Sequence, residues 1–218
     1  MYILIPACLC IAAFFIYQER RKRFGLSVIL KGLASLCFVI LGFLASKKGA
    51  GSNTILTGLI LGAIADVLLN LRYVYPEKGK ITFLAGILVF LSGHNAYLAA
   101  VFPMNAHPWI AVIAGCVLTA VLMKWLFTKI TAEKAFKIFG IVYIGAIVIL
   151  NCTALLNLIT SYRTFHLYFA AGAVLFLISD IVLILNTFGP ESRFSLRITN
   201  LSLYYIGQIL IALSLLYL

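Results

Sequence analysis

Two aspartates within long apolar segments are the residues of this sequence best placed to do chemistry. Asp66 lies in ILTGLILGAIADVLLNL and Asp180 in FAAGAVLFLISDIVLILN. The other acidic residues are expected in short polar loops beside Lys or Arg: Glu19, Glu77, Glu133 and Glu191. An ionisable group in the middle of a lipid-spanning helix costs roughly 2.5–3.5 kcal/mol. We therefore interpret Asp66 and Asp180 as a catalytic pair.

A pair of buried carboxyls suits acid–base chemistry. Two carboxyls that share a low-dielectric cavity seldom both ionise, so one holds a proton while the other is charged. That arrangement provides a general acid beside a general base. The sequence contains no HExxH, GxSxG, P-loop or dinucleotide-binding fingerprint, and its five cysteines show no CxxC or Cys/His spacing. We expect no cofactor and no bound metal.

The composition is that of an integral membrane protein. The 218 residues are 64% hydrophobic and 11% charged, with a mean hydropathy of +1.12. Apolar segments long enough to cross about 30 Å of hydrocarbon recur between short polar breaks. The predicted spans are 2–17, 26–46, 54–72, 81–101, 108–127, 138–159, 165–188 and 196–218. The predicted fold is thus all-α, a bundle of eight transmembrane helices in a single domain, 1–218.

The basic residues predict the orientation of this bundle. Thirteen of the 17 Lys and Arg residues fall at the first, third, fifth and seventh connections. By the positive-inside rule, both termini then face away from the cytoplasm. The net charge of +11 accordingly reflects topology and not a nucleic-acid partner, and the RRKR run at 20–23 is expected to be a topology anchor. The predicted location is a bacterial plasma membrane, with membrane lipids as neighbours.

Residue counts from the cytoplasmic ends place several polar groups at similar depth. At 1.5 Å per residue, Asp66 and Lys31 lie roughly 9 Å deep, Tyr204 roughly 10 Å and Asp180 roughly 13 Å. The same count puts His94 roughly 21 Å deep, well above this layer, where a core histidine is expected. Spacings of four residues place these groups on polar helix faces. The faces comprise Gly58, Gly62, Asp66 and Asn70; Ser27, Lys31 and Ser35; and Asn200, Tyr204 and Gln208.

Each of these residues also has a structural interpretation. Asp66 and Lys31 can form a purely structural ion pair, and Lys31 can instead extend to the membrane interface. Intramembrane asparagines often bond across helices. That role is expected for each of Asn70, Asn151, Asn157 and Asn200 when it is considered alone.

Five segments, in this order, resemble the YhhN/lysoplasmalogenase family of eight-helix membrane proteins. The resemblance spans nearly the whole chain. The matching positions are Lys31, followed here by Gly32 in place of Pro; Asp66, preceded by Ala65 in place of Gly; His94 and Tyr97; Ser179 and Asp180; and Tyr204, Tyr205 and Gln208.

The resemblance implies hydrolysis of the vinyl ether bond of lysoplasmalogens, which releases a fatty aldehyde and glycerophosphoethanolamine or glycerophosphocholine. Asp66 and Asp180 would be the catalytic acids, and a lysophospholipid would be the partner. Lys31 and basic residues at the rim of the cavity would attract its phosphate. The supporting residues would be Lys31, Asn70, His94, Tyr97, Ser179, Asn200, Tyr204, Tyr205 and Gln208.

Two other classes of function remain open at this stage. A small proton-coupled transporter would carry protons on the two aspartates, with Lys31 as counter-charge. Against it, neither aspartate segment contains Pro. A structural lipid-binding protein would tolerate Asn at both positions with little loss of stability.

Overall fold

The computed structural model describes residues 1–47 and 49–218. These residues form eight long α-helices and three single-turn 3-10 helices. The α-helices are α1 (Leu4–Arg20), α2 (Phe24–Ala45), α3 (Ala50–Val74), α4 (Gly79–Val101), α5 (Pro108–Phe127), α6 (Lys134–Thr160), α7 (Thr164–Phe188) and α8 (Phe194–Ser214). The predicted all-α class is confirmed, and each predicted span overlaps one of these helices.

Seven of the helices within the described ranges, α2 to α8, are long and apolar enough to cross a membrane. The remaining helix, α1, has only 17 residues, which at 1.5 Å per residue is at the short limit for a bilayer. The chain is therefore an integral membrane protein, while the eighth span and the single domain stay predictions. Apolar side chains on the outer face of α5, including Trp109, Ile113 and Val121, are exposed, as expected where lipid is the solvent.

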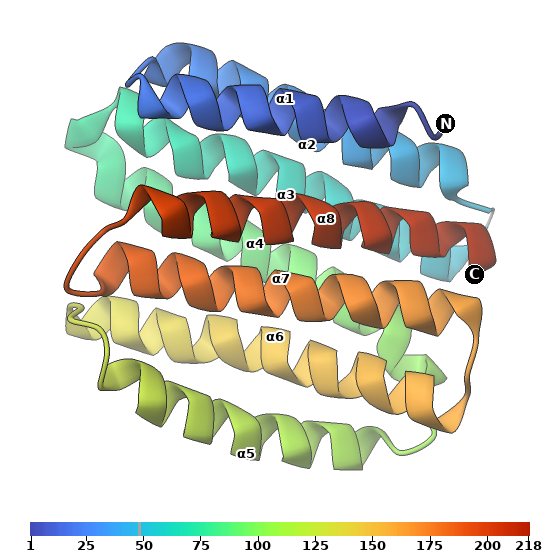
Figure 1. Cartoon of the computed structure of the whole chain (residues 1–218). Coiled ribbons are helices and arrows are strands. Elements are labelled where there is room, and N and C mark those ends of the chain that lie inside the picture. The colour runs from blue at the N-terminus through green and yellow to red at the C-terminus, as the bar shows by residue number, and fades with distance from the viewer. Residues whose placement is uncertain (48) are drawn as a thin grey trace.

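Successive helices run antiparallel, so that both termini lie at the same end of the bundle (Figure 1). The connections between α1 and α2, α3 and α4, α5 and α6, and α7 and α8 gather at the opposite end (Figure 1). The thirteen basic residues assigned to these connections thus lie at or near one end. The side of the membrane that this end faces remains a prediction.

The aspartate-bearing helices occupy the interior of the arrangement. α3 packs against α2, α4 and α8, and α7 packs against α6 and α8, whereas α5 lies at the edge against α6. Glycines permit the closest approaches. A Cβ atom on Gly93 of α4 would lie 3.2 Å from the carbonyl oxygen of Gly58 on α3, and one on Gly172 of α7 would lie 2.7 Å from that of Gly207 on α8. Gly58 thus lies where α3 and α4 approach each other closely.

Candidate active site

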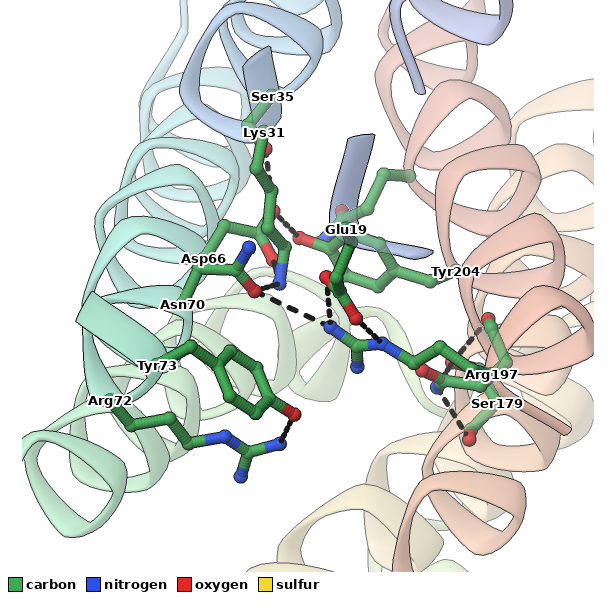
Figure 2. Close-up of polar contacts among 12 residues, drawn as sticks. Glu19, Lys31, Ser35, Asp66, Asn70, Arg72, Tyr73, Ser179, Arg197 and Tyr204 are labelled. Atoms are coloured by element: carbon green, nitrogen blue, oxygen red, sulfur yellow. Dashed lines mark hydrogen bonds and ion pairs between the residues drawn. The ribbon is translucent and has the colours of Figure 1, made fainter. Parts of the chain in front are cut away.

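The Asp66 carboxylate on α3 is surrounded by polar side chains from α2 and α8. Asp66 Oδ1 lies 3.0 Å from Lys31 Nζ. Asp66 Oδ2 accepts hydrogen bonds from Ser35 Oγ at 2.5 Å and from Tyr204 Oη at 2.6 Å. All four residues are at least 96% buried. The predicted meeting of Asp66, Lys31 and Tyr204 in one layer is confirmed (Figure 2).

Helical spacing explains why these groups reach one carboxylate. Lys31 and Ser35 are one turn apart on α2 and therefore point to the same side. Tyr204 and Gln208 are likewise one turn apart on α8. Tyr97 Oη donates a hydrogen bond to Gln208 Oε1 at 2.9 Å, and Gln208 Nε2 lies 3.5 Å from Tyr204 Oη. A hydrogen-bonded chain thus links α4, α8 and α3.

A second charged pair extends this network toward the end of the bundle that carries the basic connections. Lys31 Nζ and Arg197 Nη2 approach Asn70 Oδ1 at 3.5 and 3.4 Å. Arg197 Nε and Nη2 donate to the two Glu19 oxygens at 2.8 and 3.0 Å (Figure 2). The side chains of this pair are each only 10% exposed. The expectation that Glu19 lies in a polar loop is wrong, because this pair joins the last turn of α1 to the first turn of α8 inside the protein.

Lys31 is also buried more deeply than an interfacial role would require. Its side chain is 3% exposed and contacts Asp66 and Asn70. Extension to the membrane interface is therefore wrong for this residue, and Lys31 does not lie at an open rim. Moving the amine to the interface would leave the buried Asp66 carboxylate without its counter-charge.

Asp180 on α7 has a different environment. It is 4% exposed and accepts a hydrogen bond from Tyr143 Oη of α6 at 2.8 Å. Across the described ranges, the ion pairs found do not include Asp180. The residue lines an apolar pocket of about 50 Å³ between α3, α4, α6 and α7. The lining residues are Leu69, Phe83, Ile87, Phe90, Phe136, Phe139, Gly140, Tyr143, Asp180, Leu183, Ile184, Thr187 and Phe188.

The His94 side chain reaches the Asp180 site. Its Nε2 is 3.5 Å from the same Tyr143 oxygen that donates to Asp180. His94 is buried, as expected for a core histidine, and its depth in the membrane stays a prediction. The Nδ1 atom of His94 is buried and has no hydrogen-bond partner, so a water or a substrate group is needed to satisfy it.

The two aspartates belong to adjoining but separate clusters. Aromatic rings lie between them: the Tyr204 ring, whose hydroxyl binds Asp66, has its centroid 5.2 Å from that of Phe176 and 5.9 Å from that of Phe90. Phe90 also lines the Asp180 pocket. The two sites therefore adjoin through aromatic side chains, without a direct hydrogen bond between the two carboxyls.

The remaining predicted site residues hold helices together. Asn200 Nδ2 donates to Ser179 O at 2.9 Å and to Ser179 Oγ at 2.8 Å, which ties α8 to α7 beside Asp180. Tyr205 packs its ring against Phe38 and Tyr204. Cross-helix bonding is confirmed for Asn200, and for Asn157, which donates to Val101 O at 2.9 Å. Asn151 instead donates to Ile147 O of its own helix.

Sequence reasoning missed Tyr143, Glu19 and Arg197. A signal existed for Tyr143, because Asn151 follows it by eight residues and so lies on the same helical face. No comparable signal marked Glu19 and Arg197. Glu19 is adjacent to a basic run and Arg197 follows a short connection, and both positions resemble solvated polar ends.

Comparisons with known proteins identify the family of this chain. The family model described as the YhhN family matches residues 26–215. A protein of Bos taurus named lysoplasmalogenase TMEM86A is 29% identical over 197 residues, which cover 86% of this chain and 77% of the relative. Lysoplasmalogenase TMEM86A of Homo sapiens is 29% identical over 198 residues, with the same coverage. No solved structure matches the chain. Because the family model covers most of the sequence, including both aspartates, the chain belongs to the YhhN family.

Proposed function

We propose that this chain hydrolyses the vinyl ether bond of a lysoplasmalogen and releases a fatty aldehyde and a glycerophospho-ethanolamine or -choline. The observation that carries this proposal is the Asp180 carboxyl at the wall of an apolar pocket, where Tyr143 holds it. The relatives named lysoplasmalogenase support the same class of reaction.

The reaction begins with transfer of a proton from Asp180 to the vinyl carbon farther from the ether oxygen. The carbon–carbon double bond supplies the electron pair for the new C–H bond, and an oxocarbenium ion forms. Water then adds to the carbon bonded to oxygen and loses a proton, and Asp180, now a carboxylate, accepts it. The resulting hemiacetal collapses to aldehyde and alcohol. One carboxyl thus acts first as an acid and then as a base.

Asp66 acts as the ionised member of the pair. Its carboxylate contacts one ammonium and two hydroxyl donors, a set of partners that stabilises the charged form. Its negative charge is fixed beside the Asp180 pocket and favours the oxocarbenium ion electrostatically, since preorganised charges in a low-dielectric site act strongly on a transition state. Tyr204 and Lys31 keep that charge in place.

The pocket as observed is small. About 50 Å³ accommodates a few water molecules but not a lipid chain. Substrate entry therefore requires side chains of α4, α6 and α7 to move apart. The phenylalanines at positions 83, 136 and 188 pack mutually at centroid distances of 5.5–6.0 Å and are the groups that would separate.

Proton-coupled transport has less support from the geometry. α3 and α7 run unbroken through Asp66 and Asp180, whereas transporter sites typically use discontinuous helices whose ends contact the ion.

The test is incubation of the purified protein in D₂O with an alkenyl lysophospholipid and, separately, with an acyl lysophospholipid. Mass spectrometry should find a fatty aldehyde with deuterium at carbon 2 from the alkenyl lipid only, because protonation at carbon is specific to the vinyl ether. Aldehyde without this deuterium would refute the carbon-protonation step. Fatty acid released from the acyl lipid instead would refute the proposed substrate.

A further inference from the structure

One partly buried cation near the pocket lacks an acidic partner among the described residues. Arg72 lies in the last turn of α3, and its Nη2 donates a hydrogen bond to Tyr73 Oη at 2.6 Å. Its guanidinium also lies 4.7 Å from the centroids of the Tyr73 and Phe83 rings. The Nε atom is buried and has no hydrogen-bond partner. Among the described residues, the ion pairs found do not include Arg72.

The charges around Arg72 leave one positive charge uncompensated. Lys31 pairs with Asp66, and Arg197 pairs with Glu19. Glu19 already accepts two hydrogen bonds from Arg197. Figure 2 shows the Arg72–Tyr73 pair beside this network without a bond to it. The α3 C-terminus offers only a weak partial negative charge.

Arg72 also borders the Asp180 pocket. Leu69, one turn earlier on the same face of α3, lines that pocket, and so does Phe83, whose ring lies against the Arg72 guanidinium. Asp180 is on the same lining. A ligand that reaches from Arg72 to Asp180 therefore passes along apolar and aromatic side chains.

We propose that Arg72 binds the phosphate of a single-chain phospholipid whose reactive end enters the Asp180 pocket. A phosphodiester carries one negative charge, which matches the one surplus cation when Asp180 holds its proton. The planar guanidinium has donors left for phosphate oxygens, including Nε. In a lysoplasmalogen the glycerol separates the phosphate from the vinyl ether. This assignment rests on the proposed function, since the position of the reactive bond is taken from it.

The test measures binding to the purified full-length protein in detergent by native mass spectrometry. The probes are a 1-O-alkyl lysophosphatidylcholine, which lacks the vinyl bond and is not cleaved, a 1-O-alkylglycerol of the same chain length, and inorganic phosphate. In Arg72→Gln, the affinity for the phosphate lipid relative to the alkylglycerol should fall about 10- to 100-fold, the range for hydrogen bonds to a charged group. Arg72→Lys, which keeps the charge but not the planar fork, should fall between this variant and the wild type.

Arg21→Gln is the matched control. Arg21 is exposed, lies toward the same end of the bundle and has its guanidinium 5.0 Å from the Tyr17 ring centroid. Tyr17 does not line the pocket, whereas Phe83, the ring that Arg72 contacts, does. Its substitution should leave the affinity ratio unchanged.

Four outcomes decide the assignment. An unchanged ratio in Arg72→Gln overturns it, as does equal loss in Arg21→Gln. If inorganic phosphate alone binds as tightly as the alkyl lysophosphatidylcholine, and this binding also depends on Arg72, the lipid assignment is overturned. Arg72-dependent lipid binding without aldehyde release in the D₂O assay supports the phosphate site and refutes the hydrolase proposal, so that the two failures are distinguishable.

Discussion

The hydroxyl of Tyr143 donates a hydrogen bond to Asp180 Oδ2 at 2.8 Å at the wall of an apolar pocket, and His94 Nε2 lies 3.5 Å from the same hydroxyl oxygen. The Tyr143 hydroxyl therefore connects two titratable groups on α7 and α4. The proposed acid is thus oriented by a residue on α6 while one side of it remains open to the pocket.

Replacing Asp180 by Asn should remove the transferable proton and keep the fold. The amide oxygen still accepts the Tyr143 hydrogen bond, so the melting temperature should change little. Aldehyde release from an alkenyl lysophospholipid should fall by about 10²–10⁴-fold, the usual contribution of a general acid. Thr187→Val is the control, because Thr187 lines the same pocket but has no proposed proton-transfer role. Activity near the wild-type level in Asp180→Asn would eliminate Asp180 as the acid.

Tyr143→Phe should weaken the orientation of Asp180 without removing the acid. The loss of a hydrogen bond to a carboxyl corresponds to about 1.5–3 kcal/mol, or roughly 10- to 150-fold in kcat/KM. The loss should appear mainly in kcat, since the substitution removes only the hydroxyl that orients Asp180 and leaves the ring in the pocket lining. A change confined to KM would show that Tyr143 binds substrate instead.

The Lys31–Asp66 pair should show strong coupling in a double-mutant cycle. Asp66→Asn alone leaves a buried ammonium without a partner and should cost about 3–5 kcal/mol, whereas addition of Lys31→Met should recover most of that loss. Unfolding in mixed micelles provides the measurement. Aldehyde release should stay low in the stable double variant if Asp66 supplies a catalytic charge. Full activity there would show that the pair is purely structural.

The buried Glu19–Arg197 pair should matter far more to stability than its exposed counterpart at the same end of the bundle. Glu19→Gln strands Arg197 between α1 and α8 and should cost about 3–5 kcal/mol. Glu133→Gln breaks the exposed ion pair with Lys80. The Lys80 side chain is 57% exposed and that of Glu133 is 66% exposed, so the loss in unfolding free energy should be at most about 1 kcal/mol. Equal losses in the two variants would contradict the burial of Arg197.

Gly172→Ala should loosen the α7–α8 contact behind Asp180. The added methyl would lie 2.7 Å from Gly207 O, so the helices must separate, at a cost of about 1–3 kcal/mol. Gly25→Ala is the control, because a Cβ there meets nothing within 4 Å and alanine favours the helix by up to about 1 kcal/mol. Thermal unfolding of the two variants should therefore shift in opposite directions.

The helices and the polar cluster around Asp66 could be predicted from the sequence. Apolar length predicted each helical segment, because the hydrocarbon core sets how many residues a span needs. Spacing by four residues placed Lys31 and Ser35 on one face, and Tyr204 and Gln208 on another, since the helical repeat is regular. These local rules, with the distribution of basic residues, were enough to bring Asp66, Lys31 and Tyr204 together.

Partners across non-adjacent helices were decided by tertiary packing alone. Tyr143 meets Asp180, and Glu19 meets Arg197 over 178 positions of sequence, because helices distant in the chain pack side by side and their rotations about their own axes fix which side chains meet. The sequence alone determined that two acids are buried in apolar helices. The tertiary structure decided that Asp66 is paired with Lys31 while Asp180 lines the pocket, because the cost of a buried charge depends on which neighbour the packing provides.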